Sequence, residues 1–249
     1  MAPQDRLAQA DLIVPVGEGG VQRFLRPTVH NVGVYGPVKL LERVGESLRV
    51  PAGIVGERVI WLGGNHLSVL PVYEELGAEK DATGTVVVQF DAHLDVYQLH
   101  DINPNLANGN FLLHSEETLP SVVNVGHRDL FLSAGEIREK FTATYSSLDI
   151  AHDPERCAKE IRQRAEGAKR VWVDIDVDVF DQTIMPAVHH PLPFGPTPLL
   201  ILKLLDAAFD GNVVGVSISE FDPWRDNRDA GLNLLGWLIE WVLLRWYEA

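Results

Sequence analysis

The chain has 249 residues, of which 46% are hydrophobic and 22% are charged, a composition typical of a soluble globular protein. Its formal charge of −14 argues against nucleic acid as a partner, because phosphate binding needs a basic surface. The same charge favours cationic ligands or metals. No stretch reaches the ~20 uninterrupted apolar residues of a membrane span, so we expect no membrane partner. The length, without a visible linker or repeat, predicts a single domain over residues 1–249.

Cysteine use and the N-terminal sequence predict the compartment. The single cysteine, Cys157, excludes an intrachain disulfide framework and fits a reducing environment. The first residues lack the basic and apolar regions of a signal peptide. We therefore expect a cytoplasmic protein.

Apolar strand-like runs alternate with helix-period segments along the chain. The predicted strands are 11–16, 59–62, 85–90, 121–125, 142–145, 170–176 and 213–219. The predicted helices are 37–44, 68–76, 134–141, 154–166, 198–209 and 232–247. Several strands are continuous apolar runs, which is typical of strands covered on both faces. The alternation predicts an α/β fold, a three-layer αβα sandwich with a mostly parallel sheet of about eight strands.

The longest irregular stretches are 17–35, 96–110, 179–197 and 220–230. Three of them directly follow a strand end that carries polar motifs. Open α/β sheets bind their ligands at such strand ends. A surface excursion is the competing explanation for a long loop.

Asp91, His93 and Asp95 follow the predicted strand 85–90 at every second position. In an extended chain, side chains two residues apart point to the same face. Without a cation, these groups would repel one another or be costly to desolvate. Carboxylate plus imidazole suits Mn²⁺, Fe²⁺, Co²⁺ or Zn²⁺ better than Ca²⁺ or Mg²⁺. The alternative is a polar turn after a buried strand.

Asp174, Asp176 and Asp178 repeat this spacing at the end of the predicted strand 170–176. A calcium loop has the same spacing, but it needs glycine at its sixth position and glutamate at its twelfth. This chain has Val179 and Met185 there, so the calcium-loop interpretation fails. Two such strand ends predict one shared metal site, and a metalloenzyme is the first hypothesis.

Two further strand ends carry candidate site residues. Gly63 and Gly64 permit a tight turn that places His66 at the start of a helix. A single histidine there is more often packed or at the surface than a ligand. Glu220 lies just beyond the last predicted strand, where it would suit a cationic substrate group or be an ordinary solvated acid.

These motifs, in this order and over most of the chain, resemble those of the arginase/agmatinase (ureohydrolase) family. The family's Gly-Gly-Asp-His resembles residues 63–66, and its Asp-Ala-His-x-Asp is identical to residues 91–95. Its Ser-x-Asp-x-Asp-x-x-Asp-Pro-x-x-x-Pro resembles residues 174–186, and its Glu-x-Asn-Pro resembles residues 220–223. The resemblance implies an arginase-like αβα fold.

The resemblance also implies a site with two Mn²⁺ ions per subunit, with Ni²⁺, Co²⁺ or Zn²⁺ as alternatives. The implied metal ligands are His66, Asp91, His93, Asp95, Asp176 and Asp178. Asp91 and Asp176 would bridge the two ions. A metal-bridging hydroxide would attack the guanidinium carbon of a small cationic guanidino or amidine substrate and release urea or an amine. Glu220 would hold the cationic group. Members of the family usually assemble as trimers or hexamers, so the resemblance also implies a homo-oligomer of one of these kinds.

The chain departs from the family at three positions. Asn65 replaces an Asp next to the first implied ligand, and Asp174, the first acid of the second motif, stands where Ser is usual. Asn108 stands where the family's proton-shuttle His is expected, and an amide cannot supply a titrating proton. Proton delivery would fall to water, to an acid, or to His100 or His114.

The candidate catalytic residues are therefore Glu220, Asp178 and Asn108. Tyr97 tilts the substrate away from L-arginine, because agmatinase-like members tend to carry Tyr there. Arg225, next to Trp224, would pair with a substrate carboxylate or be a surface residue.

Two functions fit this pattern. The first is a binuclear-metal hydrolase of linear amidines, agmatinase-like or a guanidino-acid hydrolase. The second is a non-catalytic or regulatory arginase-fold protein that binds metal without the shuttle. A deacetylase on a related fold is disfavoured, because that class needs one metal and this chain has two ligand strands.

Overall fold

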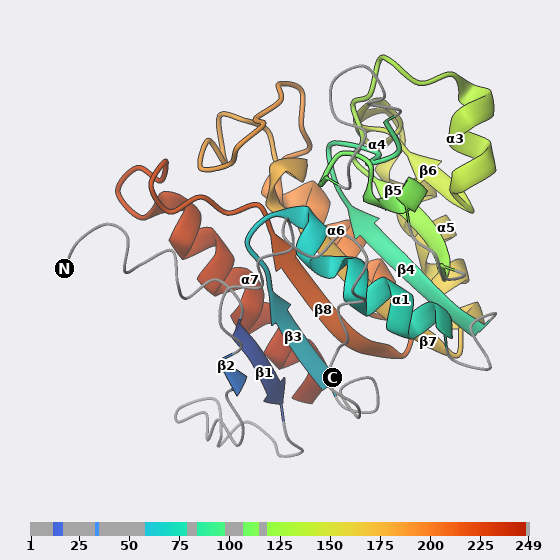
Figure 1. The fold of residues 1–249 in the computed structure, drawn as a ribbon, viewed down its shortest axis with the longest axis horizontal. Helices are drawn as coiled ribbons and strands as arrows, with labels where there is room; N and C mark the ends of the chain where they lie inside the picture. Colours follow the sequence, from blue (N-terminus) through green and yellow to red (C-terminus); the bar gives the residue numbers. More distant parts are fainter. Residues whose placement is uncertain are drawn as a thin grey trace.

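A computed structural model describes residues 12–16, 33–34, 58–78, 84–97, 107–114 and 119–247. They contain an eight-stranded sheet with the order β2-β1-β3-β8-β7-β4-β5-β6 (Figure 1). The strands are β1 (Leu12–Val16), β2 (Gly33–Val34), β3 (Arg58–Leu62), β4 (Thr85–Phe90), β5 (Ser121–Val125), β6 (Ala143–Tyr145), β7 (Arg170–Asp176) and β8 (Val213–Ser219). From β3 to β6 all neighbours are parallel, whereas β1 pairs antiparallel with both β2 and β3.

Helices cover both faces of the sheet. They are α1 (Leu70–Ala78), α2 (Phe111–His114), α3 (Ala134–Lys140), α4 (Ser147–His152), α5 (Pro154–Gly167), α6 (Pro198–Ala208) and α7 (Ala230–Tyr247), with the 3₁₀ helices η6 (His66–Val69) and η8 (Val177–Val179). Buried residues of α4, α5, α6 and α7 form one apolar cluster with the sheet, and those of α1 and α2 form a second. The predicted three-layer αβα sandwich with a mostly parallel sheet is confirmed.

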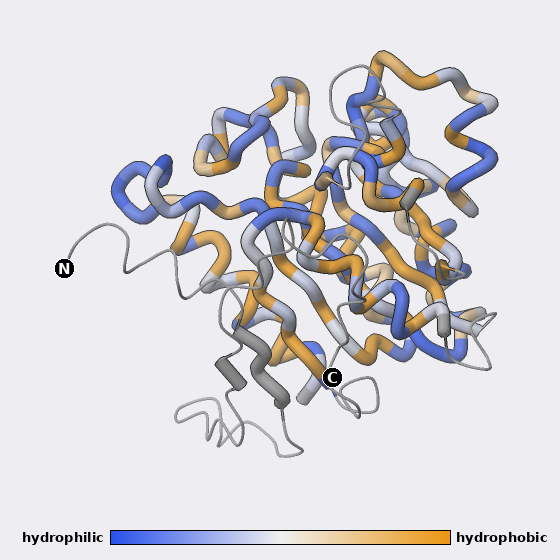
Figure 2. Tube along the Cα trace, in the orientation of Figure 1, coloured by the Kyte–Doolittle hydropathy of each residue, from blue (hydrophilic) through white to orange (hydrophobic). Residues whose placement is uncertain are grey.

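The distribution of hydropathy follows these layers. Figure 2 shows hydrophobic residues along the central strands, whereas the loop between β8 and α7 is largely hydrophilic. Strand β7 is buried from its second residue to its last, as expected for a strand covered on both faces. None of the described helices is long and apolar enough to cross a membrane.

Continuous β-branched runs located the central strands well. The predicted strands 85–90, 121–125, 170–176 and 213–219 coincide with β4, β5, β7 and β8. The predicted helix 68–76 instead divides into η6 and α1, with Pro71 in the first turn of α1. The predicted helix 37–44 lies outside the described residues.

Several of the short elements were not predicted. Strand β2 falls within the stretch 17–35 that we expected to be irregular, and α2 has only four residues. Helix α4 had a readable start signal, because the side chains of Ser146 and Asp149 form a capping box. Its six residues are too few for a helical apolar period to stand out.

Four neighbouring strands, β3, β8, β7 and β4, place the motif residues at one edge of the sheet. All four run parallel, so their carboxyl ends lie together. His66, Asp91, Asp176 and Glu220 each follow or end one of these strands. The topology therefore brings together segments that are up to 154 residues apart in sequence.

Candidate metal centre

The turn after β3 places His66. Gly63 N–H donates to Ile218 O at 2.8 Å, which ties this turn to β8. A side chain at Gly63 would place its Cβ 1.8 Å from Ser68 Oγ, so the present packing of Ser68 against this turn depends on glycine. His66 follows at the start of η6 and is 1% exposed. This histidine is thus buried at the sheet edge that carries the acidic motifs.

The first acidic motif is a turn and does not continue the strand. Strand β4 ends at Phe90, Asp91 Oδ1 accepts a hydrogen bond from His93 N–H at 2.6 Å, and Asp95 has φ of 51°. Our expectation of an extended chain with a period of two is therefore wrong for residues 91–95. The three side chains approach one another through bends in the backbone, and the left-handed conformation of Asp95, a non-glycine residue, costs conformational strain.

The second motif keeps its strand geometry for two of its three acids. Asp174 and Asp176 both lie in β7, and Asp178 lies in η8. Asp176 Oδ1 accepts a hydrogen bond from Asp178 N–H at 2.9 Å, so the carboxylate of one candidate ligand caps the turn that carries the next.

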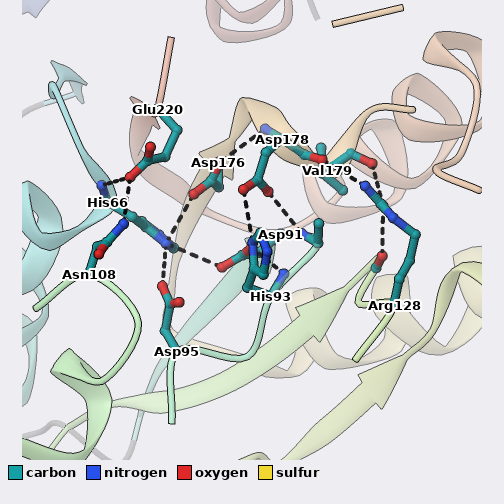
Figure 3. Close-up of polar contacts among 12 residues, drawn as sticks. His66, Asp91, His93, Asp95, Asn108, Arg128, Asp176, Asp178, Val179 and Glu220 are labelled. Carbon is teal, nitrogen blue, oxygen red and sulfur yellow. Dashed lines mark hydrogen bonds and ion pairs between the residues drawn. The ribbon is translucent and has the colours of Figure 1, made fainter. Parts of the chain in front are cut away.

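Three carboxylates surround one ring nitrogen of His66. Its Nδ1 lies 2.8 Å from Oδ2 of Asp95, 3.2 Å from Oδ2 of Asp91 and 3.3 Å from Oδ2 of Asp176 (Figure 3). The other ring nitrogen, Nε2, lies 2.8 Å from Asp174 Oδ2. If Nε2 carries the proton, Nδ1 presents a lone pair to three acids. A cation between them would remove that repulsion.

The second imidazole has a similar arrangement. His93 Nδ1 lies 2.9 Å from Asp178 Oδ2 and 3.8 Å from Asp91 Oδ1. Burial alone would lower the pKa of His93, but the hydrogen bond and charge of Asp178 outweigh it and raise the pKa to about 9. The acids surrounding both rings therefore stabilise positive charge.

Burial and mutual repulsion raise the pKa values of two carboxylates in the site, Asp91 and Asp176. Burial and then the charge of Asp95 raise the pKa of Asp91 to about 7. Burial and then the charges of Asp178 and Asp91 raise the pKa of Asp176 well above its usual range. Buried acids whose ionisation is resisted in this way are typical of a site that receives a cation or another charged group.

These donors fit a pair of divalent cations. Two groups have ligand atoms that all lie within 4.8 Å of one another: His66, Asp91 and Asp176, and Asp91, His93 and Asp178. Asp91 belongs to both, as a bridging ligand would. Asp176 belongs to the first alone, so its bridging role stays a prediction. Oxygen and imidazole donors without thiolate suit Mn²⁺ and its neighbours.

Arg128 supports the turn that carries Asp178. Its guanidinium donates to the backbone carbonyls of Asp178 at 2.8 Å and Val179 at 2.9 Å (Figure 3). It also donates to the carbonyl of Phe180 at 3.3 Å. One side chain therefore satisfies three carbonyls of a turn whose helix is too short to satisfy them.

Replacing Arg128 with Met should lower the free energy of unfolding by about 2 kcal/mol, because buried carbonyls lose their donor. The Mn²⁺ affinity should fall by about tenfold as Asp178 loses its support. Calorimetry gives the stability, and titration of metal-free protein gives the affinity. Arg156→Met, at an exposed ion pair with Asp149, should change the stability by less than about 0.5 kcal/mol. Equal effects of the two substitutions would contradict the role of Arg128.

Glu220 closes the site on the side of β8. It has φ of 65°, and its N–H donates to Gly64 O at 2.7 Å. Its Oε1 accepts hydrogen bonds from His66 N–H at 2.8 Å and from Asn108 Nδ2 at 3.3 Å. The amide at the predicted shuttle position thus contacts the predicted substrate-binding carboxylate.

A cavity of about 230 Å³ opens beside these residues. It is lined by His66, His93, Asp95, Tyr97, Asn108, Gly109, Asp176, Asp178, His190 and Glu220. Trp224 and Arg225 do not line it; Arg225 pairs with Asp222 at 3.1 Å, as the surface interpretation expected. His100 and the side chain of His114 lie outside the described residues.

Sequence reasoning missed His190. It lies in the loop after η8, its ring lines the cavity, and its centroid is 6.3 Å from that of His93. The consecutive pair His189 and His190 in a loop that follows a motif-bearing strand was the available signal. No periodicity connects this pair with the metal motifs, so the loop's path had to be known.

The fold and donor set define an α/β protein with a candidate binuclear metal centre at the carboxyl edge of its sheet. Residues 30–242 match the profile of the arginase family, and the chain belongs to that family.

Individual relatives show how far the likeness extends. The chain is 30% identical over 200 residues to a mitochondrial arginase of Medicago truncatula, covering 77% of this chain and 56% of the relative. It is 32% identical over 171 residues to the N(1)-aminopropylagmatine ureohydrolase of Thermus thermophilus, covering 68% and 56%. The chain thus spans little more than half the length of these curated relatives.

A solved structure supports the fold. The proclavaminate amidino hydrolase of Streptomyces clavuligerus superposes with a TM-score of 0.61 at 21% identity, covering 75% of this chain and 62% of that one. At this identity the likeness concerns the fold alone.

Proposed function

We propose that this chain is a binuclear-metal hydrolase of C–N bonds in linear amidines or guanidino compounds. One observation carries the proposal: five of the six proposed metal ligands, all but Asp91, line the same cavity as the buried carboxylate of Glu220. A cavity with a carboxylate at one wall and a metal-type donor set at another suits a small cationic substrate. The family membership supports the same reaction class.

The proposed ligands of two Mn²⁺ ions are His66, Asp91, His93, Asp95, Asp176 and Asp178. When bound, such a pair supplies electrophilic activation of water near neutral pH. Ni²⁺, Co²⁺ and Zn²⁺ suit the same nitrogen and oxygen donors and remain alternatives.

The chain's own residues bind and orient the substrate. Glu220 pairs with the cationic group, and the hydrogen bond from Asn108 holds the Glu220 carboxylate in place. Because Asn108 has no titrating proton, we assign proton delivery to the leaving amine to water or to His190, whose ring lines the cavity. Tyr97 lines the cavity, and we assign its bulky phenol the role of restricting the substrate's tail.

With Mn²⁺ bound, the protein should release urea or ammonia from an amine or carboxylate guanidino compound. We expect kcat/KM for the best of agmatine, guanidinobutyrate and formiminoglutamate to exceed that for L-arginine by about tenfold. The reason is that Tyr97 has no small amide group with which to bind the α-amino-acid end of arginine. A colorimetric assay of this panel with Mn²⁺, Ni²⁺, Co²⁺ and Zn²⁺ measures it. If the protein releases urea or ammonia from every compound of the panel no faster than the metal ion does alone, the proposal of a hydrolase is contradicted.

The second candidate is a non-catalytic arginase-fold protein that binds metal. The contact that favours it is the Asn108 amide on Glu220, at the place where a proton shuttle was expected. Both candidates bind metal, so turnover separates them and metal analysis does not. The homo-oligomeric state, a trimer or hexamer, and the cytoplasmic location stay predictions.

A further inference from the structure

Asp174 is the one acid of the second motif for which the proposed metal site has no use. It is fully buried in β7, and it lies on the far side of the His66 ring from the other carboxylates. Asp174 Oδ2 lies 2.8 Å from His66 Nε2 and accepts a hydrogen bond from Tyr73 Oη at 2.7 Å. Its Oδ1 accepts a hydrogen bond from the hydroxyl of Ser217.

Both ring nitrogens of His66 face carboxylates: Nε2 faces Asp174, and Nδ1 faces the acids of the proposed metal site. With a cation bound at Nδ1, the one proton of the ring would be on Nε2, where the Asp174 carboxylate can accept it as a hydrogen bond. Ring nitrogens of metal-binding histidines are commonly fixed in this way by an acceptor on the opposite side.

The acceptor is itself held by elements on both sides of it. Trp172 Nε1 donates to Ser217 Oγ at 3.0 Å, which leaves the Ser217 hydroxyl proton for Asp174. The Trp172 ring lies against Gly215, where an added Cβ would be 2.0 Å from a ring carbon. Glycine in β8 thus makes room for the indole that orients the serine. Tyr73 adds a donor from α1.

We propose that Asp174 is a positioning residue that orients His66 as an Nδ1 ligand for the metal pair. It is not itself a metal ligand, because both of its oxygens are engaged by Ser217, Tyr73 and His66. The oxygen of a serine at this position would be one bond closer to the backbone and would carry no charge, so it would hold the ring less firmly. This inference rests on the metal site of the proposed function, but it does not depend on turnover.

The test measures metal binding and the His66 tautomer in separate experiments. Metal-free wild type, Asp174→Asn and Asp174→Ser are titrated with Mn²⁺, following free ion by electron paramagnetic resonance. We expect both variants to bind about 10–100-fold more weakly. Tyr73→Phe, which removes one donor and keeps the contact between Asp174 and His66, should weaken binding by less than about threefold. Circular dichroism melting confirms that each variant is folded.

The second measurement needs no variant. In Zn²⁺-loaded wild type, ¹⁵N chemical shifts of the imidazoles should show His66 protonated at Nε2 and metal-bound at Nδ1. A proton on Nδ1, or unchanged Mn²⁺ affinity in a folded Asp174→Asn variant, would overturn the role of Asp174 and leave the hydrolase proposal intact. Wild-type protein that binds no divalent ion would overturn both. Weaker Mn²⁺ binding by the Asp174 variants would support the positioning role of Asp174 whether or not the wild-type protein hydrolyses any substrate of the panel.

Discussion

Asp176→Ala should abolish stoichiometric metal binding and, with it, any hydrolysis. Asp176 is 2% exposed, and its two oxygens serve different partners: Oδ2 lies 3.3 Å from His66 Nδ1, and Oδ1 accepts from Asp178 N–H. The substitution therefore removes one donor and also releases the turn that carries a second. Elemental analysis of protein purified in Mn²⁺ should give less than about a tenth of the wild-type content.

A matched variant separates the two effects of that substitution. Asparagine is also a good cap for the start of a helix, so Asp176→Asn keeps the hydrogen bond to Asp178 N–H and removes the charge. If charge is what the cations require, Asp176→Asn should lose metal nearly as completely as the alanine variant. Asp181→Ala, five residues further along the chain and outside both donor groups, should retain metal. Near-wild-type metal in Asp176→Ala would refute the ligand assignment.

Glu220→Gln should leave metal content unchanged and lower kcat/KM by at least about 100-fold. Glutamine keeps an oxygen that can accept from His66 N–H, so the loop retains its hydrogen bond and only the negative charge is lost. A charge-assisted pair with a buried carboxylate is the strongest contact that the cavity offers a cationic substrate. Steady-state kinetics on the best substrate of the panel, with parallel metal analysis, measures the effect.

The control for this prediction lies two residues further along. Asp222 carries the same charge in the same loop, but it pairs with Arg225 at a more exposed position. Asp222→Asn should therefore change kcat/KM by less than about threefold, since a screened surface pair contributes little. Equal losses of kcat/KM in the two variants would mean that activity depends on the overall charge of the loop and that Glu220 does not bind the substrate directly.

Much of the site could be predicted because its residues follow strands that are recognisable locally. Long β-branched runs such as 85–90 and 170–176 form strands in almost any buried context, and acids placed just after them must lie at a strand end. That reasoning located Asp91 and Asp176 correctly. It failed on the backbone between Asp91 and Asp95, because a turn and a strand can both present alternate polar residues.

Other features depend on contacts that are distant in sequence. Asn108 was interpreted as the loss of a proton shuttle, and the structure adds that its amide donates to Glu220, 112 residues away. Asp174 looked like an excess acid beside the metal motif, and the structure places its Oδ2 2.8 Å from Nε2 of His66, 108 residues away. Both contacts follow from which strands are neighbours, and a short segment's hydropathy carries no information about that order.

By itself, the sequence determined the central strands, the layered α/β class and the kinds of donor that end the motif-bearing strands, because these follow from local side-chain chemistry and periodicity. Only the tertiary structure decided that β3, β8, β7 and β4 lie side by side and that their ends share one cavity. It also decided which nitrogen of His66 faces the acids and which faces Asp174. The physical reason is that strand order depends on how helices pack over both faces, a property of the whole chain.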